Sequence, residues 1–416
     1  MLSARSRAYL GIVLLVATCA GMLFTGDLRA HTYAYLLLYA GAAAGYLLAL
    51  SGLSALPTTA IVAAGLLLRL LLFPGEPSLS DDYHRYIWDG AVQTEGINPY
   101  LHAPSSAALD AVGYPERGLI NHPDLRTIYP PLSELLFYGM ARAGVSSAAG
   151  LKTVFGLFDL GVALLIWTAA GRRRKEALAL YLLHPMVAQE TWSSAHLDAA
   201  PTLLVVAAAL LIVRGSDLRA GLALGLGAAF KFYPGFLLIP ALVGNRARPL
   251  PLLSGFAVGF GLPYVPYLLT GAALGSITET GTTPEFNSSV FYLLRFVLPY
   301  STARIVVITA FVILAVLLAR RRSGRAVTTH AFAVTATLLV LLLPVVHPWY
   351  WVMAVALGSL AGVRLPIFLG LAAPASYTTY AGAGFRQRLW ARVLSYSVLV
   401  APSADLKAIA TDAKAT

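Results

Sequence analysis

The chain alternates apolar segments with short polar or basic turns, and this alternation limits the folds open to it. A helix needs ~20 apolar residues to span a bilayer, and fewer where flanking side chains reach the interface or the bilayer thins locally. We predict spans near 9–25, 32–50 and 56–74, and, after a polar stretch, near 149–170, 176–190, 197–213, 219–232, 235–244, 249–270, 301–319, 327–345, 349–363, 366–383 and 388–402. Since lipid satisfies no backbone polar group, the pattern predicts an all-α polytopic membrane protein.

The composition supports this prediction. With 58% hydrophobic residues, 12% charged residues and a mean hydropathy of +0.72, the chain has too little polar surface for a soluble protein of 416 residues. Arg5 and Arg7 before the apolar residues 8–20 are also typical of a signal peptide, but further apolar segments follow at once, which favours a retained first helix. Cys19 is the single cysteine, so the sequence excludes an intramolecular disulfide framework.

The net charge of +11 reflects where the basic residues fall. Of the 30 Lys and Arg residues, 17 lie in turns that this topology places on one side: Arg5, Arg7, Arg172, Arg173, Arg174, Lys175, Arg214, Arg219, Arg246, Arg248, Arg320, Arg321, Arg322, Arg325, Arg364, Lys407 and Lys414. Cytoplasmic loops carry an excess of Lys and Arg. We therefore predict a multi-pass protein of the cell (inner) membrane with both termini in the cytoplasm, and we expect no nucleic-acid partner.

One stretch is too long and too polar to be a simple turn. Residues 74–131 form an external loop on this topology, and they are rich in turn-forming Asn-Pro, Tyr-Pro and His-Pro pairs. Residues 132–143 are apolar but short, which favours a helix lying in the outer interface. We interpret residues 1–416 as a single transmembrane domain whose external loop carries the site, because long ordered loops tend to hold functional residues.

The loop opens with acidic residues. Asp81, Asp82, Arg85 and Asp89 lie within nine residues, beside His84. A carboxylate held near membrane depth can accept a proton from a hydroxyl, as general-base catalysis requires. The alternative is a solvated surface in which Asp81 and Asp82 simply pair with Arg85, three or four residues later.

Further ionisable residues occur at the predicted outer ends of later helices: Glu190, His196, Asp198, Lys231 and His347. Such groups are rare at membrane depth and usually functional. His196 and Asp198 are equally well explained as an interfacial helix cap, and His347 as part of an aromatic belt with Trp349, Tyr350 and Trp351. The spacing of His196 and Asp198 suits no zinc motif, so we expect no tightly bound metal.

Two buried polar residues favour structural roles. Asp159 lies inside a predicted span, and we expect it to pair with a buried cation such as Arg69. His184 precedes Pro185, so it is either a ligand for backbone groups at a helix break or a catalytic residue.

Several motifs occur in an order that is specific as a set. They are Asp81-Asp82 with Arg85-Tyr86 and Trp88-Asp89-Gly90, Gly96-Ile97-Asn98-Pro99-Tyr100, Asn121-His122-Pro123-Asp124, Tyr129-Pro130-Pro131, Glu190 with His196 and Asp198, Lys231-Phe232-Tyr233-Pro234, and His347-Pro348-Trp349-Tyr350. Over roughly residues 57–383 the chain resembles the polyprenol-phosphate-sugar-dependent GT-C glycosyltransferases, in particular the bacterial mannosyltransferase-like branch. It departs from them in having two further apolar segments before the loop.

The resemblance implies a GT-C-like bundle of about 12–14 transmembrane helices with interfacial helices in the external loop. It implies transfer of one sugar, mannose favoured, from a polyprenyl-phosphate donor to a hydroxyl of a glycan, glycolipid or protein acceptor on the extracytoplasmic face, with inversion. Asp81, or else Asp82, would be the general base. Lys231, His347 and Arg85 would bind the donor phosphate, and the residues expected to bind sugar or acceptor are Trp88, Tyr129, Glu190, His196, Asp198 and Tyr350. No cofactor or divalent metal is expected, because the leaving phosphate is already stabilised.

Three other classes are considered. A polyprenyl-linked lipid or sugar transporter would also use broken helices and membrane charges, but it should show repeated halves and charges reachable from both sides. A scaffold subunit would have no use for outward ionisable residues. An enzyme that transfers from a lipid pyrophosphate would require a basic outer loop, whereas this loop is acidic.

Overall fold

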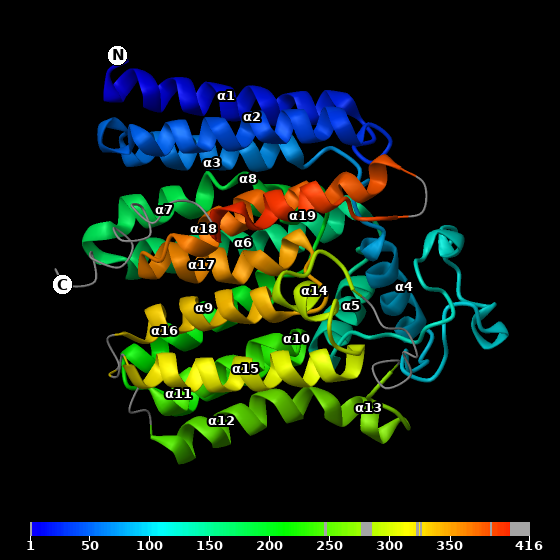
Figure 1. Ribbon diagram of the computed structural model, residues 1–416. Helices are drawn as coiled ribbons and strands as arrows, with labels where there is room; N and C mark the ends of the chain where they lie inside the picture. The colour runs from blue at the N-terminus through cyan, green and yellow to red at the C-terminus, as the bar shows by residue number, and fades with distance from the viewer. Residues whose placement is uncertain are drawn as a thin grey trace.

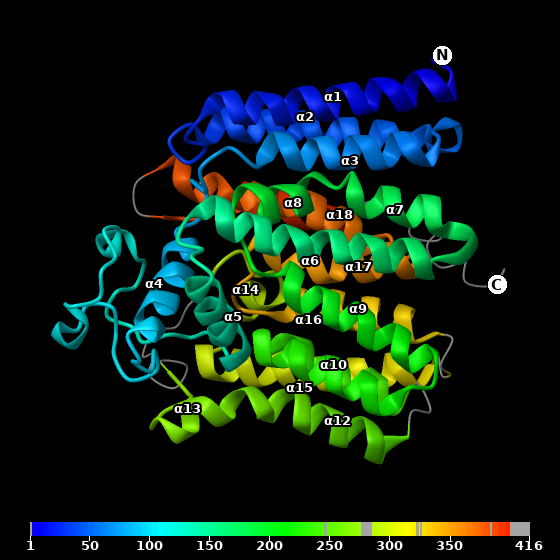
Figure 2. The same cartoon turned by 180° about the vertical axis from the view of Figure 1, so that it is seen from behind.

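The computed structural model describes residues 2–244, 248–275, 285–321, 324, 327–382 and 385–399. These residues form helices joined by turns and contain no β-strand; one parallel bridge joins Phe286 to Val345. Figure 1 and Figure 2 show the helices running roughly side by side in one bundle, from α1 and α2 at one edge to α12 at the other. The all-α fold predicted from the sequence is confirmed.

The helices follow the predicted apolar segments in order. Before the loop come α1 (Ala4–Thr25), α2 (Thr32–Ser51), η1 (Leu53–Ala55) and α3 (Thr58–Leu72). The loop contains α4 (Asp82–Thr94), η2 (Ala107–Leu109) and η3 (Arg117–Leu119), and α5 (Pro131–Arg142) follows it. The bundle then continues with α6 (Ala148–Ala169), η4 (Gly171–Arg173), α7 (Arg174–Leu182), α8 (Pro185–Ala188), the π-helical turn η5 (Gln189–Ser193), α9 (Ala199–Val213) and α10 (Asp217–Phe230).

The last part of the chain contains several short helices. They are η6 (Tyr233–Leu237), α11 (Leu238–Val243), α12 (Pro249–Gly261), η7 (Leu262–Tyr264), α13 (Val265–Leu269), α14 (Val290–Leu294), α15 (Tyr300–Arg321), α16 (Thr328–Leu342), η10 (Pro348–Tyr350), α17 (Trp351–Ala361), α18 (Leu365–Ala372), η11 (Ala373–Ala381), α19 (Leu389–Tyr396) and η12 (Ser397–Leu399). The predicted span 388–402 is thus an eight-residue helix plus one 3-10 turn, and its residues 400–402 lie outside the described part.

Five helices of the described chain are long and apolar enough to cross a membrane: α1, α2, α6, the continuous run Pro249–Leu269 and α15. Shorter apolar helices of 10–17 residues lie among them. The protein is therefore a membrane protein whose bundle combines full-length and broken helices. Broken helices are tolerated in a bilayer where their free backbone groups meet protein or a polar cavity.

Helices α10 and α12 make the closest contact in the bundle. A Cβ atom added to Gly221 would lie 2.0 Å from the carbonyl oxygen of Leu252, and one added to Gly255 would lie 2.1 Å from that of Leu218. Gly225 and Gly259 lie one turn further along each helix, where an added Cβ would lie 2.4 and 2.3 Å from a carbonyl oxygen of the opposite helix. The reciprocal Gly-x-x-x-Gly pattern lets the two backbones touch, as is common between helices in lipid.

The bundle has two chemically different ends. At the end where α1 begins, Lys175 donates to the carbonyl groups of Ser54 and Leu56, and Arg7 donates to Ser51, so turns with basic residues converge there. At the opposite end lie α4, α5 and α13 with the long loop (Figure 1). The polar residues singled out in the sequence gather at that second end.

The predicted buried ion pair is confirmed. Arg69 Nε lies 2.6 Å from Asp159 Oδ2, and both side chains are inaccessible to solvent. Tyr181 and Trp192 also donate to the Asp159 carboxylate, each over 2.9 Å. His184 Nε2 lies 3.0 Å from the carbonyl oxygen of Ile367, so it contacts backbone at the helix break, the first of the two roles considered for it.

Candidate active site

Helix α4 begins at Asp82 and carries the acidic motif into the loop. It packs on α5, where a Cβ added to Gly90 would lie 2.6 Å from the carbonyl oxygen of Phe137. This close packing holds α4 against the end of the bundle. On another side of α4, buried Trp88 packs with Val92 and Leu109 in the apolar core of the loop, under the guanidinium of Arg117 at 5.1 Å.

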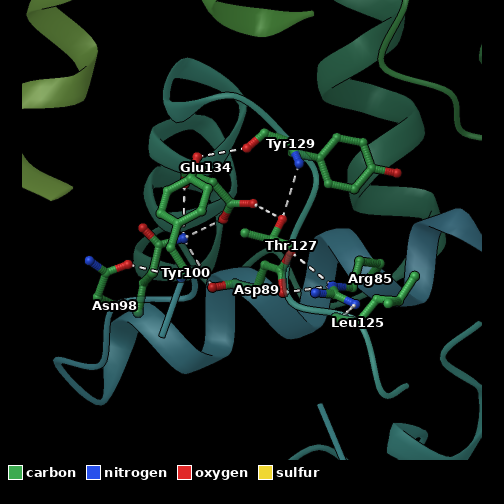
Figure 3. Close-up of polar contacts among 9 residues, drawn as sticks. Arg85, Asp89, Asn98, Tyr100, Leu125, Thr127, Tyr129 and Glu134 are labelled. Carbon is green, nitrogen blue, oxygen red and sulfur yellow. Dashed lines mark hydrogen bonds and ion pairs between the residues drawn. The ribbon is translucent and has the colours of Figure 1, made fainter. Parts of the chain in front are cut away.

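Arg85 points into the loop core. Its Nε contacts Asp89 Oδ1 at 2.9 Å and its Nη1 donates to the carbonyl oxygen of Leu125 at 2.9 Å. Figure 3 shows this contact beside the one in which Thr127 donates to Glu134, 2.6 Å away, while the ring of Tyr129 points away from the cluster. Burial raises the pKa values of both Asp89 and Glu134. The positive charge of Arg85 therefore offsets the negative charge of buried carboxyl groups in the loop core. Arg85 does not lie beside Lys231 and His347, with which it was expected to bind the donor phosphate.

Asp81 is held by an arginine from the turn between α1 and α2. Arg29 donates from Nη1 and Nη2 to the two carboxylate oxygens at 3.0 and 2.9 Å. The Arg29 guanidinium lies 4.6 Å from the ring centre of Tyr380. The two partners are 32% and 41% exposed, so this is a half-buried bidentate pair on the outer rim.

Asp82 faces a different way. Asn121 donates to its Oδ1 at 3.0 Å, and its Oδ2 lies 3.9 Å from His196 Nδ1. Burial raises the pKa of Asp82, opposed by the Asn121 contact and the positive charge of Lys231. The carboxylate remains 25% exposed and has no bidentate cation partner among the described residues, so a substrate hydroxyl can reach it.

A lysine and a buried carboxylate lie behind Asp82. Lys231 Nζ lies 2.7 Å from Asp198 Oδ2, and Tyr233 donates to Asp198 Oδ1 at 2.8 Å. Lys231 comes at the end of α10, where the chain turns into η6, so the helix break brings its ammonium group to the site. The Lys231 ammonium also lies 5.5 Å from the ring centre of Tyr350.

Aromatic rings line this group. His196 and His347 both stack on Trp349, with ring centres 3.6 and 4.3 Å away. Phe286 stacks on His347 at 4.5 Å. Burial and the charge of Lys231 lower the pKa of His347 to about 3, so its imidazole is neutral near pH 7 and can offer one N–H.

Glu190 is the fully buried carboxyl group of the site. It has no solvent exposure, and the hydroxyl of Tyr377 contacts both carboxylate oxygens at 3.0 Å. Its Oε2 is 3.6 Å from His196 Nε2.

The structure thus gathers most of the residues singled out in the sequence: Asp82, Glu190, His196, Asp198, Lys231, His347 and Tyr350. Burial raises the pKa of the Tyr129 hydroxyl, and Tyr129 lies close enough to Asp82 for the charge of that carboxylate to raise this pKa further. Asp81 lies on the rim, whereas Arg85 and Trp88 lie in the loop core. Among the described residues no group of three or more His, Cys, Asp or Glu side chains is arranged to hold a metal ion.

Four members of the site were not predicted from the sequence: Arg29, Asn121, Tyr233 and Tyr377. Asn121 begins the Asn-His-Pro-Asp motif and Tyr233 lies in the Lys-Phe-Tyr-Pro motif, so both were predictable as hydrogen-bond donors in the site. Arg29 and Tyr377 come from segments 52 and 187 residues from their partners, and no local pattern indicates either contact.

This all-α membrane bundle, with a long loop and a polar site at one end, is the architecture of a GT-C-like membrane glycosyltransferase. Residues 127–348 match Glycosyltransferase family 87 (GT87), which is more than half of the chain, and the chain belongs to this family. GT87 is itself one of the GT-C-like groups. No curated protein and no solved structure matches the chain. The protein is therefore a glycosyltransferase, as the sequence motifs indicated.

Proposed function

We propose that this glycosyltransferase moves one sugar from a polyprenyl-phosphate donor to an acceptor hydroxyl, with inversion at C1 and with Asp82 as the general base. The observation that carries the proposal is the position of Asp82. It is accessible, it lacks a bidentate cation among the described residues, and it lies near Lys231 and the imidazole ring of His196. Asp81, ranked first from the sequence, supports the proposal less well because Arg29 engages both of its oxygens.

The site offers a group for the proton that is removed and groups for the charge that develops on the leaving phosphate. Asp82 takes the hydroxyl proton as the acceptor oxygen attacks C1 of the sugar, and the bond from C1 to the phosphate oxygen breaks on the opposite face. The departing polyprenyl phosphate gains negative charge. Lys231 and an N–H of His347 would stabilise that charge, since charged hydrogen bonds in a water-poor site are strong. The mechanism needs no cofactor and no divalent metal.

In this mechanism Asp198 offsets the positive charge of Lys231 before the donor binds. In the structure its carboxylate neutralises Lys231 over 2.7 Å. A bound phosphate would share the ammonium group, and Tyr233 would keep one Asp198 oxygen satisfied meanwhile. Tyr350 and Tyr129 have rings on which a sugar face could rest, since both lie near the acidic residues and both are partly exposed.

The distribution of charge supports an extracytoplasmic site. Basic residues collect at the end of the bundle where α1 begins, and the site lies at the other end (Figure 1). By the positive-inside rule the basic end faces the cytoplasm. We therefore place the protein in the cell membrane with its loop outside, where a glycan, a glycolipid or a protein would supply the acceptor hydroxyl. Mannose is the donor sugar that we favour, on the resemblance noted above.

Membranes containing the protein, supplied with a panel of polyprenyl-phosphate sugars labelled in the sugar, test this function. We expect label to enter an acceptor from one donor, and this transfer to be lost in the Asp82→Asn variant. Donor binding or translocation with no transfer would overturn the proposal and favour a transporter. Asp81→Asn is the matched control, because it changes the adjacent carboxylate.

A further inference from the structure

His196 lies between two carboxyl groups. Its ring is 1% exposed, and neither ring nitrogen has a partner at hydrogen-bond distance. The Nδ1 atom is 3.9 Å from Asp82 Oδ2, and the Nε2 atom is 3.6 Å from Glu190 Oε2. Stacking on Trp349 fixes the plane of the ring. A buried imidazole of this kind needs partners on both nitrogens, and the two carboxyl groups are the ones in position.

Glu190 cannot be a direct sugar ligand in this arrangement, because it is fully buried. Its polar neighbours are the hydroxyl of Tyr377 and the ring of His196. Within ion-pair distance, the described part of the chain offers it no basic group besides His196. Such a carboxyl group is costly to ionise in place and acts on substrate only through a neighbour.

We propose that Glu190 is a positioning residue for the base: in its protonated form it donates to His196 Nε2, which leaves the Nδ1–H of His196 directed at the Asp82 carboxylate. This proposal rests on the proposed function, in which Asp82 is the base. The Nδ1–H contact would hold Asp82 ionised and oriented toward the acceptor. The present separations of 3.6 and 3.9 Å exceed hydrogen-bond length, and catalytic hydrogen bonds are often long before substrate binds.

The protonation states agree with this geometry. Glu190 is fully buried and no cationic side chain of the described residues pairs with it, which favours the protonated carboxyl group, and that form can donate. Burial, followed by the charges of Lys231 and His347, lowers the pKa of His196, so its ring is neutral and carries a single N–H. A donor on the Nε2 side therefore places that N–H on the Asp82 side.

The same chain of contacts should fail at alkaline pH. When Glu190 loses its proton it becomes an acceptor, so His196 would turn its single N–H toward Glu190. A lone pair would then face the ionised Asp82, and transfer should slow as the pH rises through the value at which Glu190 ionises. The titratable or charged groups facing this chain from neighbouring elements are Tyr35 and Tyr39 of α2, Tyr377 and Tyr380 of η11, Asp81, Asp198, Lys231 and His347.

The Glu190→Gln variant tests the proposal, because an amide donates to Nε2 as the protonated acid does but does not titrate. We expect Glu190→Gln to lose the alkaline fall in the kcat profile, and to keep more of the kcat at pH 7 than Glu190→Leu, which offers His196 no donor. In Tyr377→Phe the fall should move to higher pH, since that hydroxyl stabilises the carboxylate. An unshifted alkaline fall in Glu190→Gln, or a loss of kcat at pH 7 as large as that in Asp82→Asn, would overturn the proposal.

A second measurement does not depend on transfer. Nitrogen NMR of protein labelled at histidine, in lipid, reports which ring nitrogen of His196 carries the proton. We expect Nδ1–H at pH 7, a change to Nε2–H at alkaline pH once Glu190 ionises, and Nδ1–H throughout in Glu190→Gln. Nε2–H at pH 7 would overturn the proposal. If no lipid-linked donor supports transfer while the tautomer behaves as expected, the proposed function fails and the coupling of Glu190 to His196 stands.

Discussion

The two adjacent aspartates should differ sharply when each is changed to asparagine. Asp82→Asn removes the proton acceptor but keeps an Oδ1 atom to accept from Asn121, so α4 should keep its place. A general base contributes roughly 10²–10⁴-fold to rate, and we expect kcat to fall by that factor. The KM for donor should change little, because Lys231 and His347 remain.

Asp81→Asn breaks an ion pair with Arg29 whose members are 41% and 32% exposed. Exposed pairs contribute about 0.2–1 kcal/mol, so we expect a loss of stability in that range and a change in rate of no more than about fivefold. The two variants should therefore differ in rate by at least about 20-fold, and by up to about 10⁴-fold.

The assay is initial-rate transfer of labelled sugar by the purified variants over a range of donor concentrations, so that kcat and KM separate. Thermal unfolding of each variant in the same lipid checks that both fold. If Asp81→Asn abolished turnover while Asp82→Asn kept it, the assignment made from the Arg29 contact would be refuted.

The remaining predictions concern the phosphate site, the helix contacts and metal dependence. Lys231→Met should raise the donor KM by about 10–150-fold, the equivalent of a charged hydrogen bond of about 1.5–3 kcal/mol, and adding Asp198→Asn should restore stability but not affinity; binding and melting curves check both. Asp159→Ala should destabilise the fold by about 3–5 kcal/mol because it leaves Arg69 buried without its charged partner, and the Arg69→Met, Asp159→Leu double variant should recover much of that loss in thermal unfolding. Gly255→Leu should separate α10 from α12 and abolish folded protein in size-exclusion chromatography, whereas a normal elution profile would contradict the close backbone contact. Treatment with a chelator should leave the transfer rate nearly unchanged, and a strict requirement for added divalent ion would contradict the metal-free mechanism.

The helical architecture was predictable because hydropathy alone locates helices in lipid. The spans predicted near 9–25, 32–50 and 149–170 match α1, α2 and α6 to within a few residues at most boundaries. The segment 132–143 is a helix, α5, as predicted. Whether it lies in the membrane interface stays a prediction. The described residues of the predicted span 388–402 form the eight-residue α19 and one 3-10 turn, so the length of an apolar run overestimates the length of its helix.

The sequence predicted which residues belong to the site better than it predicted which of them contact one another. Residue types such as Lys231 at a helix break and His347 before an aromatic run are unusual in lipid, and they stand out without any structure. The ion pair between Arg85 and Asp89 was also predictable, since the two residues are four apart on one helix face. The sequence interpretation considered only Asp81 and Asp82 as partners of Arg85. The contact between Arg29 and Asp81 joins distant segments, so only the fold reveals which aspartate stays available.

The most direct test of the whole account is a product analysis with the purified protein in lipid, given one polyprenyl-phosphate sugar and its acceptor. We expect one molecule of polyprenyl phosphate to be released per sugar transferred, and the new glycosidic bond to have inverted configuration. Transfer from a nucleotide sugar without a lipid donor, or a product of retained configuration, would contradict it.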